Sequence, residues 1–284
     1  MNMKVDLCGV ILNNPVMTAS GTFGSGAEYA EFVDLNKLGA VVTKGVANVP
    51  WPGNPTPRVA EVYGGMLNAV GLQNPGIDLF VERDIPFLKQ FDTKIMVNVC
   101  GHSTEEYIEV VERLRDQPVD LLEINISCPN VKEGGIAFGQ DPKAVEAITK
   151  EMKKHAAQPV IMKLSPNVTD ITEMARAAEA GGADGLSLIN TITGMKIDIN
   201  RQKFVLANKT GGMSGPAIHP VAVRMVYQTA QAVRLPIVGM GGIMNAEDAI
   251  EMILAGASEA EIRARWADDV RRFRKLRGRY LLYE

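Results

Sequence analysis

The sequence predicts an α/β protein of the (β/α)8 barrel type, also called a TIM-type barrel. Seven short segments, nearly all apolar and rich in β-branched residues, alternate along the chain with amphipathic segments of helical spacing. Strands that are apolar on both faces are typical of parallel sheets covered by helices, and successive strand–helix units build such sheets with right-handed crossovers. A length of 284 residues suits a single barrel with a large core.

The predicted strands are short, and most end in polar residues. They run over residues 15–20, 40–45, 94–100, 121–127, 160–165, 185–191 and 236–242. Helices are predicted between them, for example over 103–116, where Ser103 and Glu106 form a capping box that marks a helix start. Further helices are predicted over 170–182 and 245–258. After the last of these, a barrel needs its eighth strand.

The C-terminal segment predicts a helix in place of that eighth strand. Ser258 and Glu261 form a further capping signal, and eight Lys and Arg against five Asp and Glu make residues 259–284 basic. Apolar residues then recur at helical spacing: Ile262, Trp266, Val270, Phe273 and Tyr280. We therefore divide the chain into a barrel domain, 1–258, and an Arg-rich helical tail, 259–284. The basic stripe 263–279 is interpreted as a solvated helix face rather than a nucleic-acid or membrane surface.

Composition excludes several classes of protein. The three cysteines include no CxxC pair, and only three histidines are present, so neither a disulfide framework nor a metal or iron–sulfur site is indicated. No apolar run is long enough to span a bilayer, and the N-terminus lacks a signal-peptide pattern. We expect a cytoplasmic protein that binds neither a metal, nor a membrane, nor nucleic acid.

Polar side chains gather at the C-terminal ends of the predicted strands, which is where barrel enzymes build their sites. These residues are Ser20, Thr43, Lys44, Asn98, Asn125, Cys128, Lys163, Ser165, Asn190 and Thr191. Each alone has a structural explanation as a turn former or a solvent-reaching lysine. An apolar barrel mouth, however, has no structural need for two lysines. Together these residues predict a binding or catalytic site.

Two features at this end of the predicted barrel favour particular chemistry. Cys128 opens a loop that holds Gly134, Gly135 and Gly139, so it is either a small buried residue or a base or nucleophile on a closing loop. The glycine-rich stretches 210–216 and 239–243 precede predicted helices, and backbone amides at such turns can bind a phosphate. The second stretch follows the seventh strand, where barrels often bind phosphate.

Specific motifs now identify a resemblance. They are "ASGTFG" at 19–24, "TKG" at 43–45, "NAVGLQNPG" at 68–76, "VNVCG" at 97–101, "INISCPN" at 124–130, "KLSPN" at 163–167, "INT" at 189–191, "GGMSGPA" at 211–217 and "GMGGI" at 239–243. With them the chain resembles class 1 dihydroorotate dehydrogenases from about Val5 to Ser258. The stretches "NVKEGGIAFGQDP" and "KLSPNVTDI" resemble subclass 1B. The resemblance implies a barrel that oxidises dihydroorotate to orotate with FMN in pyrimidine synthesis.

The resemblance also implies partners and residue roles. Electrons would pass towards NAD through a separate iron–sulfur flavoprotein subunit that carries FAD, attached to a homodimeric core in a heterotetramer. Cys128 would be the general base, with Lys44 and Lys163 as the other catalytic residues. The substrate would contact Lys44, Asn68, Ala69, Val70, Gly71, Leu72, Asn125, Asn190 and Thr191. FMN would contact Ser20, Lys44, Gly45, Asn98, Asn125, Lys163, Ile189, Gly215, Gly241 and Gly242.

One part of the family pattern is absent. The family continues into a strand that ends in Gly-Thr and supplies half of the FMN phosphate site, and Arg263 and Ala264 stand at those positions here. A replaced or engineered C-terminus, a frameshifted reading and a natural divergent tail all remain open. Two other functions also remain: a non-catalytic barrel scaffold whose tail serves assembly, and another FMN barrel such as a dihydropyrimidine dehydrogenase or dihydrouridine synthase.

Overall fold

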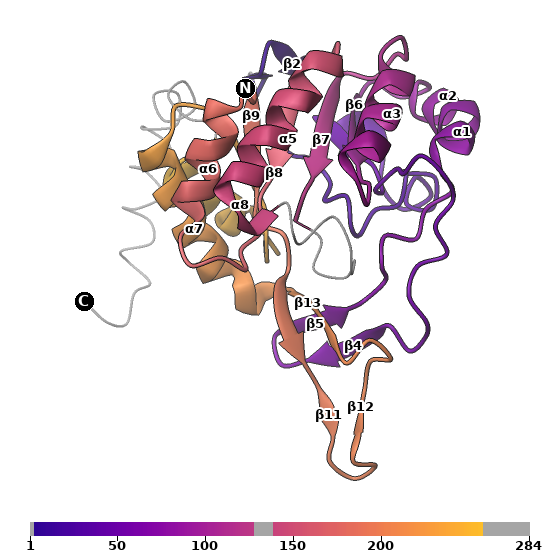
Figure 1. Cartoon of the computed structure of the whole chain (residues 1–284), viewed down its shortest axis with the longest axis vertical. Coiled ribbons are helices and arrows are strands. Elements are labelled where there is room, and N and C mark those ends of the chain that lie inside the picture. Colours follow the sequence, from indigo (N-terminus) through magenta and orange to yellow (C-terminus); the bar gives the residue numbers. More distant parts are fainter. Residues whose placement is uncertain (1–2, 128–138, 258–284) are drawn as a thin grey trace.

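A parallel six-stranded sheet forms the centre of the molecule (Figure 1). The computed structural model describes residues 3–127 and 139–257. The strands follow the order β14-β9-β8-β7-β6-β3, and every neighbouring pair is parallel. Their bounds are β3 Ala40–Val42, β6 Lys94–Val99, β7 Leu121–Asn125, β8 Val160–Lys163, β9 Gly185–Leu188 and β14 Ile237–Gly239.

Helices cover the outer face of this sheet, and each packs against its neighbour in the chain (Figure 1). They are α3 Thr104–Leu114, α5 Pro142–His155, α6 Ile171–Ala180, α7 His219–Ala232 and α8 Ala246–Ala255. A shorter helical segment precedes them as α1 Ile77–Leu79, η2 Phe80–Asp84 and α2 Ile85–Leu88. The curled parallel sheet with helices outside confirms the predicted α/β barrel class.

The residues of each strand alternate between two environments. Ile95, Val97 and Val99 of β6 face the helices and belong to the main apolar core. Met96 of β6 and Leu121 of β7 face the other way, into a second apolar cluster inside the barrel. The interior positions two residues further along β6 and β7 are polar, and the candidate site is built there.

The predicted cap of the first long helix is confirmed. The hydroxyl of Ser103 accepts a hydrogen bond from the amide of Glu106 at 3.4 Å. The carboxylate of Glu106 turns back to the amide of His102, at 2.7 Å, rather than to that of Ser103 itself. Both bonds satisfy amides at the helix start that have no partner within the helix.

The predicted first strand, residues 15–20, is wrong as a regular strand. Only Met17 pairs with β3, through a parallel bridge to Ala40. Pro15 has no amide hydrogen to donate. The amide of Thr18 donates to the carbonyl of Ala40 at 3.3 Å, but its hydroxyl, and no backbone carbonyl, accepts from the amide of Val42 at 2.9 Å. The segment therefore lies beside β3 without a continuous ladder.

A second, antiparallel sheet was not predicted from the sequence. Its order is β10-β13-β5-β4, with β4 Val59–Val62, β5 Gly65–Asn68, β10 Ile192–Met195 and β13 Thr210–Ser214. The hairpin of β11 Ile197–Asp198 and β12 Lys203–Phe204 extends beyond it (Figure 1). The remaining elements are the hairpin β1 Val5–Leu7 and β2 Val10–Leu12, and the short helices η1 Leu35–Lys37 and η3 Pro216–Ile218.

In the described part of the chain, none of the helices combines the length and the apolar character needed to cross a membrane. The predicted tail helix, with the positions Arg263 and Ala264, lies outside the described residues.

Candidate active site

A cavity of about 660 Å³ opens at the C-terminal ends of the parallel strands. Its size lies in the range of small-molecule and cofactor sites. Every described residue that the sequence analysis assigned to the site lines this cavity, except Thr43, Ala69 and Ser165. Ala69 is buried beside it, and its amide donates to the carbonyl of Arg58 at 2.7 Å. Cys128 lies outside the described residues, directly after Ser127.

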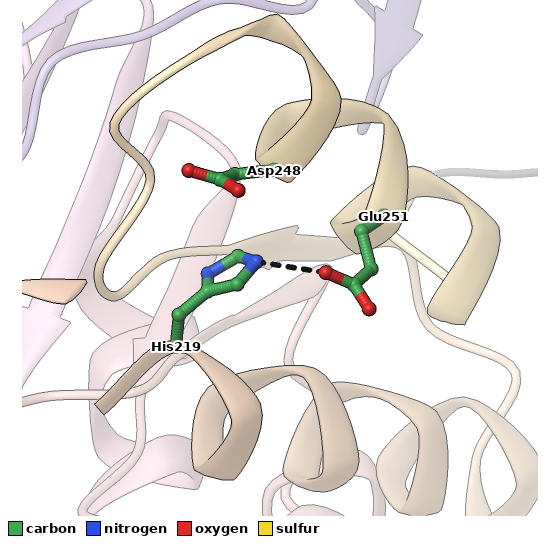
Figure 2. Close-up of side chains that lie close together, drawn as sticks. All are labelled: His219, Asp248 and Glu251. Atoms are coloured by element: carbon green, nitrogen blue, oxygen red, sulfur yellow. Dashed lines mark hydrogen bonds and ion pairs between the residues drawn. The ribbon is translucent and has the colours of Figure 1, made fainter. Parts of the chain in front are cut away.

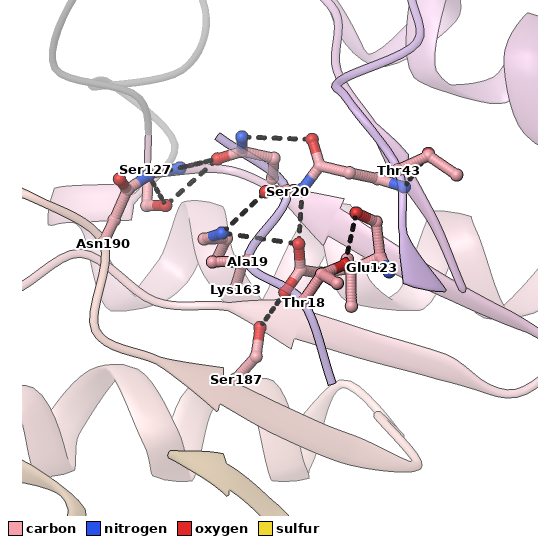
Figure 3. Close-up of polar contacts among 12 residues, drawn as sticks. Thr18, Ala19, Ser20, Thr43, Glu123, Ser127, Lys163, Ser187 and Asn190 are labelled. Carbon is pink, nitrogen blue, oxygen red and sulfur yellow. Dashed lines mark hydrogen bonds and ion pairs between the residues drawn. The ribbon is translucent and has the colours of Figure 1, made fainter. Parts of the chain in front are cut away.

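A buried ion pair lies at the floor of the site (Figure 3). The ammonium of Lys163 lies 3.4 Å from Oε2 of Glu123 and donates to the hydroxyl of Ser20 at 3.0 Å. Glu123 accepts two more bonds, from Nδ2 of Asn98 to Oε2 at 2.5 Å and from the hydroxyl of Ser187 to Oε1 at 2.8 Å. The Lys163 side chain is 6% exposed and that of Glu123 is fully buried.

Strand register creates this arrangement. Asn98 of β6 pairs with Glu123 of β7, and Lys163 of β8 pairs with Ser187 of β9, as direct Cα partners. In a parallel barrel, residues at the same level with the same facing meet in the interior. Between β7 and β8 the partners are Glu123 with Ile161 and Asn125 with Lys163, so the second pair lies one interior position further along the strands. The ammonium of Lys163 and the hydroxyl of Ser187 connect the two pairs through their bonds to Glu123.

A chain of amide groups continues from Asn98. Asn125 donates to Oδ1 of Asn98 at 3.3 Å, and its own Oδ1 accepts from the hydroxyl of Ser127 at 3.1 Å. Nδ2 of Asn190 donates to the Ser127 hydroxyl at 2.8 Å (Figure 3). The hydroxyl of buried Tyr107, on α3, holds the carbonyl of Asn125 at 2.7 Å. These contacts fix the amides that face the cavity in one orientation.

The sequence analysis missed several residues of this network. Glu123, Ser127 and Ser187 are buried here, and Asn167 donates to the carbonyl of Thr191 at 3.0 Å. A signal for Glu123 was available, because a carboxylate inside the apolar strand "LLEIN" must find a partner or remain at high energetic cost. Because side chains alternate along a strand, Glu123 shares the interior face of β7 with Leu121 and Asn125, and the site is built on that face.

Three glycines form a turn at one end of the cavity. Gly215, Gly241 and Gly242 all have positive φ, of 110°, 124° and 70°. A Cβ on Gly242 would lie 2.7 Å from the carbonyl oxygen of Gly215, so the two glycine segments touch through their backbones. Among the residues that the structure describes, none accepts a hydrogen bond from the amides of Gly241 or Gly242. Such amides suit a phosphate.

A small polar cluster braces this turn (Figure 2). His219, at the start of α7, contacts the carbonyl of Gly241 through Nδ1 at 2.9 Å and the carboxylate of Glu251 through Nε2 at 3.2 Å. Asp248 accepts from the amide of Met244 at 2.8 Å. The ligand atoms of His219, Asp248 and Glu251 lie within 4.8 Å of one another. The contacts connect α7, the glycine turn and α8.

Comparison with known proteins identifies the family. The family model for dihydroorotate dehydrogenase matches residues 2–277, which extends beyond residue 258, where the sequence analysis placed the departure from the family. Three curated relatives bear the name dihydroorotate dehydrogenase B (NAD(+)), catalytic subunit. The protein of Lachnoclostridium phytofermentans is 74% identical over 258 residues, which are 91% of this chain and 86% of that relative.

The second relative, from Alkaliphilus metalliredigens, is 69% identical over 258 residues, or 91% of this chain and 85% of the relative. The third, from Geobacter sulfurreducens, is 55% identical over 262 residues, or 92% of this chain and 86% of the relative. Both the model match and these identities cover most of the chain. The chain therefore belongs to the dihydroorotate dehydrogenase family of oxidoreductases.

Proposed function

We propose that this chain is the catalytic subunit of an NAD-linked dihydroorotate dehydrogenase, which oxidises (S)-dihydroorotate to orotate in de novo pyrimidine synthesis. The observation that carries the proposal is the cavity at the strand ends, where two lysines, four asparagines and a glycine turn converge. The relatives that it matches are named as such catalytic subunits. The family implies a flavin, and we propose FMN.

The residues present fit FMN. The amides of Gly241 and Gly242 would bind its phosphate, together with Gly215 from the adjoining segment. The ammonium of Lys163 faces the cavity from its floor, where it would lie against the flavin ring and stabilise negative charge there. Ser20, Lys44, Gly45, Asn98, Asn125 and Ile189 complete the proposed cofactor contacts. Bound FMN supplies a hydride acceptor for C6 of the substrate.

The substrate side of the cavity is rich in amides. Orotate and dihydroorotate carry a carboxylate and imide edges that both donate and accept hydrogen bonds. Asn68, Asn125 and Asn190 offer both functions, and Lys44 would neutralise the carboxylate. The turn formed by Val70, Gly71 and Leu72 lines the same side, with Ala69 buried behind it, and Thr191 follows Asn190. This set would orient the ring for loss of a proton from C5.

We propose Cys128 as the base that takes this proton. It follows Ser127, whose hydroxyl belongs to the amide chain at the end of β7. Its thiolate would accept the C5 proton while the amide chain holds the substrate ring. For the assembled enzyme we propose a homodimeric core in the cytoplasm, with iron–sulfur flavoprotein subunits that carry FAD. We also propose the division into a barrel, 1–258, and a tail, 259–284.

The test is anaerobic reduction of the flavin. The chain is saturated with FMN, dihydroorotate is added, and the flavin absorbance is followed by stopped flow. We expect rapid bleaching in the wild type, bleaching slowed by about 10²- to 10⁴-fold in Cys128→Ala, as is typical of a lost general base, and little change in Cys8→Ala. Cys8 is the matched control because it lies on the β1–β2 hairpin, away from the amide chain.

Three outcomes would contradict the proposal. A flavin that is reduced by a pyridine nucleotide but not by dihydroorotate would indicate a different FMN barrel. A chain that binds no FMN would favour the non-catalytic scaffold. Equal rates for wild type and Cys128→Ala would remove Cys128 from its role while leaving the reaction in place.

A further inference from the structure

Glu123 is a fully buried carboxylate that none of the proposed roles uses. It does not line the cavity, yet it contacts two side chains that do, Asn98 and Lys163. A third donor, the hydroxyl of Ser187, holds its other oxygen. Both oxygens are therefore fixed by named donors, and the carboxylate has one defined orientation below the cavity floor.

Stability does not explain a charged pair at this level of the barrel. Removing a carboxylate and an ammonium from water costs several kcal/mol each, and apolar residues in place of such pairs are often neutral or stabilising. Apolar residues fill neighbouring interior positions of this same barrel: Met96 and Leu121 pair on β6 and β7, and Ile161 of β8 is the direct strand partner of Glu123. A charge at position 123 is therefore best explained by what it does to its neighbours.

We infer that Glu123 is a positioning residue that holds Lys163 and Asn98 toward the flavin and, by its charge, lowers the flavin's reduction potential. The inference rests on the proposed function, because it assumes that Lys163 faces a flavin. The Nζ atom of Lys163 has two described partners, Ser20 and Glu123, which draw it to one place on the floor. Asn98 is oriented by donating to Glu123 while its oxygen accepts from Asn125.

The direction of the effect follows from charge. In the wild type, the negative charge of Glu123 offsets part of the positive potential that Lys163 exerts on the cavity. Reduction adds negative charge to a flavin, and an uncompensated ammonium nearby favours the reduced form. A Gln at position 123 has nearly the same shape but no charge, so it should raise the potential. An Asp keeps the charge but is one methylene shorter, so it should loosen the contacts instead.

The experiment measures the midpoint potential of FMN-loaded protein by anaerobic titration with dithionite and reference dyes, together with the Kd for FMN. For Glu123→Gln we expect the reduced-to-oxidised ratio at a fixed potential to rise at least tenfold, a shift of about 30 mV for a two-electron couple. For Glu123→Asp we expect an unchanged potential and a Kd for FMN raised about tenfold. Asp84→Asn is the control, because Asp84 is another buried carboxylate, outside the cavity lining.

The outcomes separate this inference from the proposed function. In this titration dithionite, and not dihydroorotate, reduces the flavin, so the measurement does not depend on the proposed reaction. Equal midpoint potentials in the wild type and Glu123→Gln would overturn the inference. An equal shift in Asp84→Asn overturns it too, because loss of any buried charge would then suffice. A wild type that binds no FMN refutes both. If Glu123→Gln does not fold, the test is the Kd for FMN of Glu123→Asp. A Kd equal to that of the wild type would overturn the inference.

Discussion

The glycine turn gives the sharpest structural prediction, for the variant Gly242→Ala. Gly242 has φ of +70°, in the left-handed region. A Cβ there would lie 2.7 Å from the carbonyl oxygen of Gly215 and 2.8 Å from Cβ of His219. Both neighbours are fixed, one by the backbone and the other by the start of α7. The alanine must therefore bear backbone strain and also displace a segment of the site.

Two costs add up in this variant. The left-handed conformation costs an L-residue about 1–2 kcal/mol. Overpacking a well-filled site costs about 1–3 kcal/mol more. The free energy of unfolding should therefore fall by roughly 2–5 kcal/mol, a drop in Tm of roughly 4–20 °C at about 2–4 °C per kcal/mol. The assay is chemical denaturation of the protein without FMN, since bound ligand would add its own stabilisation. The Kd for FMN, measured separately, should rise at least tenfold.

Gly9→Ala is the matched control. Gly9 also has positive φ, +84°, but a Cβ there would meet nothing within 4 Å. It should show the backbone strain alone, about 1–2 kcal/mol, with FMN binding unchanged. The reasoning is refuted if Gly242→Ala is no less stable than Gly9→Ala, because the turn would then accommodate a side chain without displacing Gly215 or His219.

Two further predictions concern the cluster beside the turn and a cysteine far from it. In His219→Ala the half-buried carbonyl of Gly241 loses its side-chain partner, and an ordinary hydrogen bond contributes about 0.5–1.5 kcal/mol. The affinity of His219→Ala for FMN should therefore fall. Glu251→Gln leaves the contact between His219 and Gly241 in place and should bind FMN nearly as the wild type does. Equal losses of FMN affinity in the two variants would contradict this reasoning. Burial, with the nearby charge of Asp184, raises the pKa of the Cys8 thiol to about 12. Only the thiolate is nucleophilic, so Cys8 should resist alkylation at pH 8 in the folded protein and react once the protein is unfolded in urea. Mass spectrometry of the labelled peptides would measure this. Rapid labelling of Cys8 in the folded protein would be inconsistent with this pKa.

Much of this architecture could be predicted from local sequence. Six of the seven predicted strands are present, because buried parallel strands are short apolar runs that stand out between amphipathic helices. The polar residues at their ends could be predicted too, because each ends or directly follows one of these apolar runs. The antiparallel sheet was missed because its strands, such as β10 and β13, are rich in glycine and half-exposed, without a strong period. The segment 15–20 has the composition of a strand, but composition does not show that the Thr18 hydroxyl takes the place of a backbone carbonyl as the partner of the Val42 amide.

The partners of Glu123 could not be predicted in this way. A period of two places Glu123 on the inner face of β7, but which residues it meets depends on the register of β6 and β8. A slip of one residue in β8 would turn Lys163 toward the helices and leave the carboxylate without its cation, at the cost of an unpaired buried charge. The ion pair therefore penalises the wrong register as well as shaping the floor of the site. The residues beneath the cavity thus help to specify the sheet on which the cavity depends.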